Sequence, residues 1–69
     1  MRSKLIALVN DLLNDDNGIS SDAYRSLWEV LEATGNKDVA EAMGNTVKAQ
    51  DNRFYLTEET VEQFNELVS

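Results

Sequence analysis

The sequence predicts a mainly α (α+β) domain, in which about four helices surround one core and a short β-hairpin lies between the third and fourth helices. Apolar residues recur at the spacing of one helical face in four segments, and helix-capping residues or glycines separate these segments. Residues 46–56 instead combine strand-forming residues with turn residues. The 69 residues, 42% of them hydrophobic, suffice for one small core, so residues 1–69 are expected to form a single domain.

The first predicted helix lies at the N-terminus, with Ser3 as its N-cap. Its apolar residues follow the i, i+3, i+4, i+7, i+8 spacing of one face, which Ile6 widens. These inward-facing residues are Leu5, Leu8, Val9, Leu12 and Leu13. The helix is expected to end by Asn17-Gly18, where the glycine can adopt the left-handed conformation of a C-cap.

The second predicted helix has Ser20 or Ser21 as its N-cap, and Asp22 follows at its positive end. Its apolar face is broad and contains two aromatic residues. The members of this face are Ala23, Tyr24, Leu27, Trp28, Val30 and Leu31. Gly35 is expected to end the helix.

A third, shorter helix is expected to begin after Asn36, which can act as its N-cap. Its inward-facing residues are Val39, Ala40 and Met43. Residues 44–45, a glycine and an asparagine, are expected to end it.

Residues 46–56 admit two interpretations. Residues 46–49 alternate in polarity, residues 50–52 favour turns and residues 53–56 are rich in strand formers, which together favour a hairpin. In the rival interpretation, the third helix continues through Gly44, because Val47 extends the face that carries Met43.

The fourth predicted helix has a strong start signal. Thr57 is its N-cap, and Glu58 and Glu59 follow where the helix dipole favours negative charge. Leu56 and Val61 have the spacing of a hydrophobic staple. The remaining inward-facing residues are Phe64, Leu67 and Val68.

The composition excludes several kinds of chemistry. The chain has no Cys and no His, which removes disulfides, thiolate and imidazole metal ligands, Cys nucleophiles and Ser–His catalysis. Carboxylates spaced three or four residues apart on exposed helices are ordinarily solvated, and so small a domain rarely holds an enclosed pocket. We therefore expect no catalytic residues, no metal and no cofactor.

The acidic loop at residues 14–20 has some features of a helix–loop–helix calcium site, which needs oxygen ligands at loop positions 1, 3 and 5, glycine at 6 and glutamate at 12. With Gly18 at position 6, Leu13 falls at position 1 and Tyr24 at position 12. Neither residue supplies a carboxylate, so the loop is interpreted as a turn before the next helix cap.

The charge and hydropathy patterns bear on location and partners. The longest apolar run, residues 5–9, is far too short to cross a membrane. Polar residues also interrupt it before it reaches the length of the hydrophobic region of a signal peptide. We expect a soluble, cytoplasmic protein. The net charge of −7 disfavours nucleic-acid phosphates and anionic membranes as partners.

An interaction with another protein is the function that the remaining features favour. Residues 57–69 carry four glutamates and no lysine or arginine, which suits a basic partner surface. Aromatic residues are the usual anchors of such interfaces, although the helical spacing of Trp28 and Tyr24 favours core packing. Phe54 and Tyr55 should point to opposite faces of a strand, so at least one is a candidate anchor. The interface candidates are Phe54, Tyr55, Trp28, Glu58, Glu59, Glu62 and Glu66.

The sequence therefore predicts a small acidic interaction module that modulates or inhibits a protein partner by covering its surface, a role common among accessory proteins of phages and mobile elements. A winged-helix-like DNA-binding regulator is one alternative, because residues 38–44 have the texture of a helix–turn–helix unit. Residues 46–50, however, carry one basic residue where a recognition helix would need several. A homo-oligomer subunit is another alternative, because a second copy would bury further apolar surface.

Overall fold

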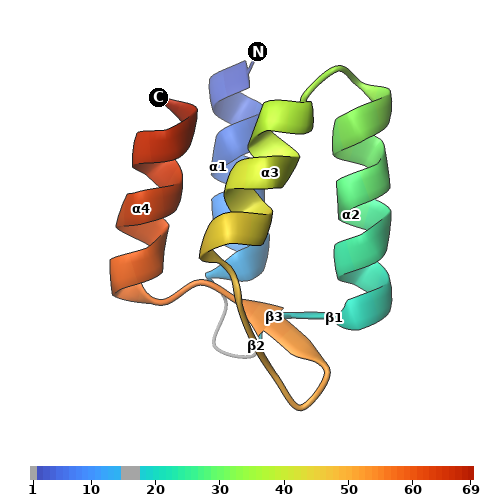
Figure 1. Cartoon of the computed structure of the whole chain (residues 1–69), viewed down its shortest axis with the longest axis vertical. Coiled ribbons are helices and arrows are strands. Elements are labelled where there is room, and N and C mark those ends of the chain that lie inside the picture. The colour runs from blue at the N-terminus through green and yellow to red at the C-terminus, as the bar shows by residue number, and fades with distance from the viewer. Residues whose placement is uncertain (1, 15–17) are drawn as a thin grey trace.

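The computed structural model describes residues 2–14 and 18–69, which form four helices and a small three-stranded antiparallel sheet. The elements in chain order are α1 (Arg2–Leu13), β1 (Ile19–Ser20), α2 (Ser21–Ala33), α3 (Lys37–Thr46), β2 (Lys48–Gln50), β3 (Arg53–Tyr55) and α4 (Glu58–Val68). The helices lie side by side and alternate in direction, and the sheet lies at one end of the bundle (Figure 1). α1 begins and α4 ends at the opposite end. The predicted fold class is confirmed.

The sheet has the order β1-β3-β2, so β3 is its central strand. β2 and β3 form the predicted hairpin, with Ala49 opposite Phe54. Asp51 and Asn52 connect them with φ angles of 53° and 63°. Positive φ at both central residues is the signature of a type I′ turn, whose twist matches that of the two strands. β1, with Ile19 opposite Phe54, was not predicted.

Gly18 lies at the point where the chain enters β1. It has a φ of 63°, and a Cβ atom at this position would lie 2.1 Å from the backbone oxygen of Phe54. Glycine is therefore required by the close approach of two backbones as well as by the dihedral angle. This role differs from the expected helix C-cap, because α1 already ends at Leu13. Residues 15–17 of the acidic loop lie outside the described residues.

Fewer apolar residues of α1 are buried than their helical spacing predicts. Val9 and Leu13 are fully buried, whereas Leu8 and Leu12 are 51% and 39% exposed. Their inward assignment is wrong, because α1 contacts the rest of the bundle along one edge of its apolar face. The helix also begins at Arg2, so Ser3 lies inside it and is not an N-cap.

α2 starts and stops as its sequence predicts. Ser20 is the N-cap and its hydroxyl accepts a hydrogen bond from the backbone N–H of Ala23 at 3.2 Å. At the other end Gly35 has a φ of 79°, and the N–H of Asn36 donates to the carbonyl of Leu31 in the Schellman pattern. Val30 is 55% exposed, so its inward assignment is wrong.

α3 continues through Gly44 to Thr46, two residues past the glycine that was expected to end it. Gly44 packs against the side chain of Trp28 and does not act as a cap. The helix ends where Val47 adopts extended backbone. Both interpretations of residues 46–56 are therefore partly right: the helix passes Gly44, and the hairpin follows it. Asn36 occupies the N-cap position without a capping hydrogen bond from its side chain.

α4 begins at the predicted cap. The Thr57 hydroxyl accepts from the N–H of Thr60, and the Thr60 hydroxyl accepts from the N–H of Thr57, which completes a capping box. Leu67 is 58% exposed, so its inward assignment is wrong. The core that the helices and β3 enclose consists of Val9, Leu13, Leu31, Val39, Ala40, Ala42, Met43, Leu56, Phe64 and Val68.

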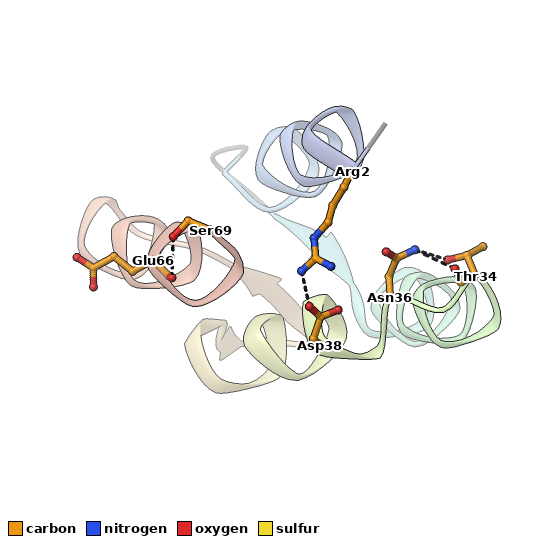
Figure 2. A network of polar contacts seen from close by, with 6 residues as sticks. All are labelled: Arg2, Thr34, Asn36, Asp38, Glu66 and Ser69. Carbon is orange, nitrogen blue, oxygen red and sulfur yellow. Dashed lines mark hydrogen bonds and ion pairs between the residues drawn. The ribbon is translucent and has the colours of Figure 1, made fainter.

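Polar contacts at the helix ends support this arrangement (Figure 2). Arg2 forms an ion pair with Asp38, which joins the start of α1 to the start of α3. The Arg2 guanidinium holds the pKa of the Asp38 carboxyl below its usual value. Asn36 donates to Thr34 across the α2–α3 turn. In the described part of the chain, no helix is long and apolar enough to span a bilayer.

Candidate interaction surface

Three aromatic rings meet where the first turns of α2 lie beside β3. Tyr24 and Trp28 lie four residues apart on α2, a spacing that places them on the same side of the helix. The Tyr24 ring stacks on Phe54 of β3, with ring centroids 4.3 Å apart and an interplanar angle of 9°. The Tyr24 and Trp28 rings are tilted, with centroids 6.1 Å apart. We call Tyr24, Trp28 and Phe54 the aromatic cluster; each is half-buried.

Gly44 of α3 makes room for the tryptophan. A Cβ atom at Gly44 would lie 2.7 Å and 2.9 Å from two carbons at the edge of the Trp28 ring. These separations are shorter than any ordinary carbon–carbon contact. The glycine inside α3 therefore allows α2 and α3 to approach each other with the Trp28 ring edge against the α3 backbone.

Two open hollows lie beside the aromatic cluster. The α3-side hollow, of about 560 Å³, is lined by Tyr24, Trp28, Glu41, Gly44 and Asn45. The strand-side hollow, of about 320 Å³, is lined by Ser21, Tyr24, Arg25, Trp28, Glu29 and Phe54. Tyr24 and Trp28 line both hollows and so form a ridge between them.

The environment of Tyr24 affects its ionisation. Partial burial raises the pKa of its phenol, because a phenolate is poorly solvated there. Burial therefore favours the neutral hydroxyl of Tyr24 over the phenolate. An uncharged hydroxyl above an apolar ring suits the contact surface of an interface, where one end of the side chain is apolar and the other can hydrogen-bond.

Tyr55 does not join the aromatic cluster. It follows Phe54 on β3, and adjacent strand residues point to opposite faces of a sheet. Its hydroxyl lies 3.2 Å from Oε1 of Gln50, to which it donates a hydrogen bond across the hairpin. Both Phe54 and Tyr55 are half-buried, so neither face of the central strand is fully open.

The predicted glutamates form a separate surface. All four lie on α4 and are exposed; they are Glu58, Glu59, Glu62 and Glu66. α3 lies between α4 and α2 in both views, so the helix that carries the glutamates is separated from the helix that carries Trp28 (Figures 1 and 2). The structure thus brings together Trp28 and Phe54 from the predicted set and leaves the α4 glutamates apart.

Sequence reasoning missed Glu41, Gly44 and Asn45 as lining residues. Gly44 was interpreted as a helix stop, because a glycine gives the same local signal whether it ends a helix or makes space for a ring. The useful signal was the combination of an aromatic pair on one helix with a lone glycine inside the next.

Among residues 2–14 and 18–69, no group of three or more acidic side chains gathers in a way that could hold a metal ion. No known protein family matches the chain, and neither does any curated protein or any solved structure.

Proposed function

We propose that this protein is an interaction module that binds a protein partner through the aromatic cluster and its two hollows. One observation carries the proposal: three stacked or tilted aromatic rings stay half-exposed around open hollows. Aromatic side chains are enriched at interface hot spots, where they supply large contact area with few rotatable bonds.

The mode of action that this surface supports is occlusion. The protein offers a shape that covers part of its partner and so modulates or inhibits it, as accessory proteins of phages and mobile elements do. The net charge of −7 favours encounter with a basic surface. Because the α4 glutamates lie away from the aromatic cluster, they contribute long-range attraction, which raises the association rate, rather than direct contacts.

DNA binding is a second candidate, and one observation favours it. Residues 2–55 have the element order helix, strand, helix, helix, strand, strand, with the last strand in the centre of the sheet, which resembles a winged helix–turn–helix. Two features count against DNA binding. α2 and α3 run alongside each other in opposite directions, whereas helix–turn–helix pairs cross at roughly 90–120° (Figure 1). Residues 37–55 also carry three basic and three acidic side chains, a neutral balance that attracts phosphates weakly.

Affinity capture from the native host, followed by affinity measurement with the purified partner, tests the proposal. Trp28→Ala removes the ridge between the hollows, and Asn45→Arg fills the α3-side hollow from an exposed position without removing a core contact. Leu67→Ala is the control, because it removes an exposed apolar side chain from α4. Circular dichroism establishes that each variant is folded.

We expect wild type and Leu67→Ala to hold the same partner. Trp28→Ala and Asn45→Arg should both lose it, with at least about a tenfold weaker Kd. A partner that the folded Asn45→Arg variant holds as tightly as wild type would rule out this surface. A shift of duplex DNA at about 50 mM salt would favour the second candidate instead.

A further inference from the structure

We infer that the α3-side hollow receives a positively charged side chain of the partner, with its aliphatic part beside Trp28 and Tyr24 and its charge against Glu41. This inference rests on the proposed function and specifies the chemistry of the bound segment. The strand-side hollow then receives a neighbouring apolar side chain of the same segment.

The charges of the two hollows differ. Among the residues that the structure describes, Glu41 is the one charged residue that lines the α3-side hollow. The strand-side hollow is lined by one acidic and one basic residue, Glu29 and Arg25, which balance. A cation therefore gains from the first hollow and little from the second. A negatively charged side chain is disfavoured in the first hollow.

The placement of Glu41 on α3 suits this role. Glu41 precedes Gly44 by three residues and Asn45 by four, so all three lie on the same side of the helix. Gly44 is the contact point of the Trp28 ring edge, so Glu41 lies within one helical turn of that contact. The site thus combines a carboxylate, an exposed amide side chain and two aromatic rings. Lysine and arginine bind such surroundings through an ion pair, hydrogen bonds and cation–π attraction, while their methylene groups cover apolar surface.

The shared ridge explains why one short segment can fill both hollows. Tyr24 and Trp28 belong to both, so side chains on either side of the ridge come from neighbouring positions of one bound chain. The stacked pair of Tyr24 and Phe54 presents apolar surface to the second side chain. The chemistry of the partner segment is therefore basic next to apolar.

A peptide titration tests the inference directly. Trp28 is the only tryptophan in the chain, so its fluorescence reports on the ridge itself. The probes are acetyl-Leu-Arg-Leu-amide and the same peptide with citrulline, which keeps the shape of arginine without its charge. Both are added to the wild type, to Glu41→Gln and to Asp11→Asn. The last two variants each remove one negative charge from an exposed helical position, but Asp11 lies on α1, outside both hollows.

We expect the arginine peptide to bind wild type and Asp11→Asn about three- to fivefold more tightly than the citrulline peptide, the size of an exposed cation–π contact with a nearby carboxylate. Glu41→Gln should abolish this preference. Equal affinities of the two peptides for wild type, no binding of either, or an equal effect of Glu41→Gln and Asp11→Asn would each overturn the inference.

Failure here is distinguishable from failure of the proposed function. Suppose that a host partner depends on Trp28 but binds Glu41→Gln and Asp11→Asn with equal affinity. The interaction function would then stand, and the inference of a positively charged partner segment would be wrong. A host partner indifferent to both Trp28→Ala and Asn45→Arg would remove the function itself.

Discussion

At the scale of single residues, two glycines determine how neighbouring elements meet. Gly18 allows two backbones to touch at the edge of the sheet, and Gly44 allows an aromatic ring to rest on a helix. Gly35 differs from both, because a Cβ atom there would meet nothing within 4 Å and only its φ of 79° is special. Gly44 is therefore needed for steric reasons and Gly35 for its backbone conformation, whereas both reasons apply at Gly18.

Gly44→Ala should move Trp28 without unfolding the domain. Alanine favours the helix by about 1 kcal/mol relative to glycine, while the Trp28 ring edge must shift outward from the new methyl group. We expect a red-shifted tryptophan emission and a free energy of unfolding, measured in urea, within about 1 kcal/mol of wild type. Gly35→Ala is the control: its strained φ should cost about 1 kcal/mol and leave the emission unchanged. An unshifted emission in Gly44→Ala would contradict the close contact.

Tyr24 should make the domain less stable in alkali. Its folded pKa is raised by burial above the unfolded value of about 10, so the folded state holds the proton more tightly. The stabilisation is complete below about pH 10 and is lost as the pH rises through the folded pKa. Urea midpoints at about pH 8 and pH 10.5 should differ more for wild type than for Tyr24→Phe, which keeps the stacked ring. Equal differences would mean that the phenol does not sense burial.

At the scale of elements, the predictability of each segment follows from how local its signal is. α2 and α4 were predicted from caps that act within three residues, Ser20 and Thr57, and both caps are confirmed. β1 was missed because two residues have no periodicity to detect. The exposure of Leu8 and Leu12 depends on which edge of α1 the bundle contacts, which the spacing of apolar residues does not encode.

The capping box of α4 gives a direct stability prediction. Thr57→Ala removes the hydroxyl that accepts from the N–H of Thr60 and leaves that donor without its partner. We expect a loss of about 1–2 kcal/mol in the free energy of unfolding. Thr57→Ser keeps the hydroxyl and should retain most of the stability. If serine and alanine were equally destabilising, the effect would come from the threonine methyl group rather than from the cap.

The hairpin turn offers a stabilising change. Asn52 has a φ of 63° at the second central position of the turn, where glycine adopts positive φ without strain. Asn52→Gly also preserves the backbone carbonyl that accepts from the N–H of Ser21 at 3.1 Å. We expect the thermal midpoint to rise, with a gain of about 0.5–1 kcal/mol, because the relief of strain at this positive φ outweighs the larger chain entropy that glycine loses on folding. Asn52→Val should lower the midpoint, and the opposite order would be incompatible with a type I′ turn.

At the scale of the whole molecule, the net charge of −7 opposes the compact state. Salt screens this repulsion over about 10 Å at 0.1 M. The thermal midpoint should therefore rise by a few degrees between about 10 mM and 500 mM NaCl, since about 1 kcal/mol corresponds to 4–8 °C in a domain of this size. KCl should act equally. A falling midpoint would mean that ion pairs such as Arg2–Asp38 outweigh the repulsion.

The candidate site was predictable only in part, because local sequence patterns do not show which distant residues meet in the fold. Trp28 and Phe54 were named from residue type, but their meeting depends on a stack through Tyr24 that joins residues thirty positions apart in sequence. The α4 glutamates were named from local charge density, which gives no information on which side of the bundle they occupy.

The common location of the two helix ends has a practical consequence. Because α1 begins and α4 ends away from the sheet, an affinity tag or fluorophore attached at either terminus leaves from that same end of the bundle (Figure 1). A linker between the two ends, with new termini opened in the exposed turn at Asp51 and Asn52, would give a circular permutant that keeps every helix whole.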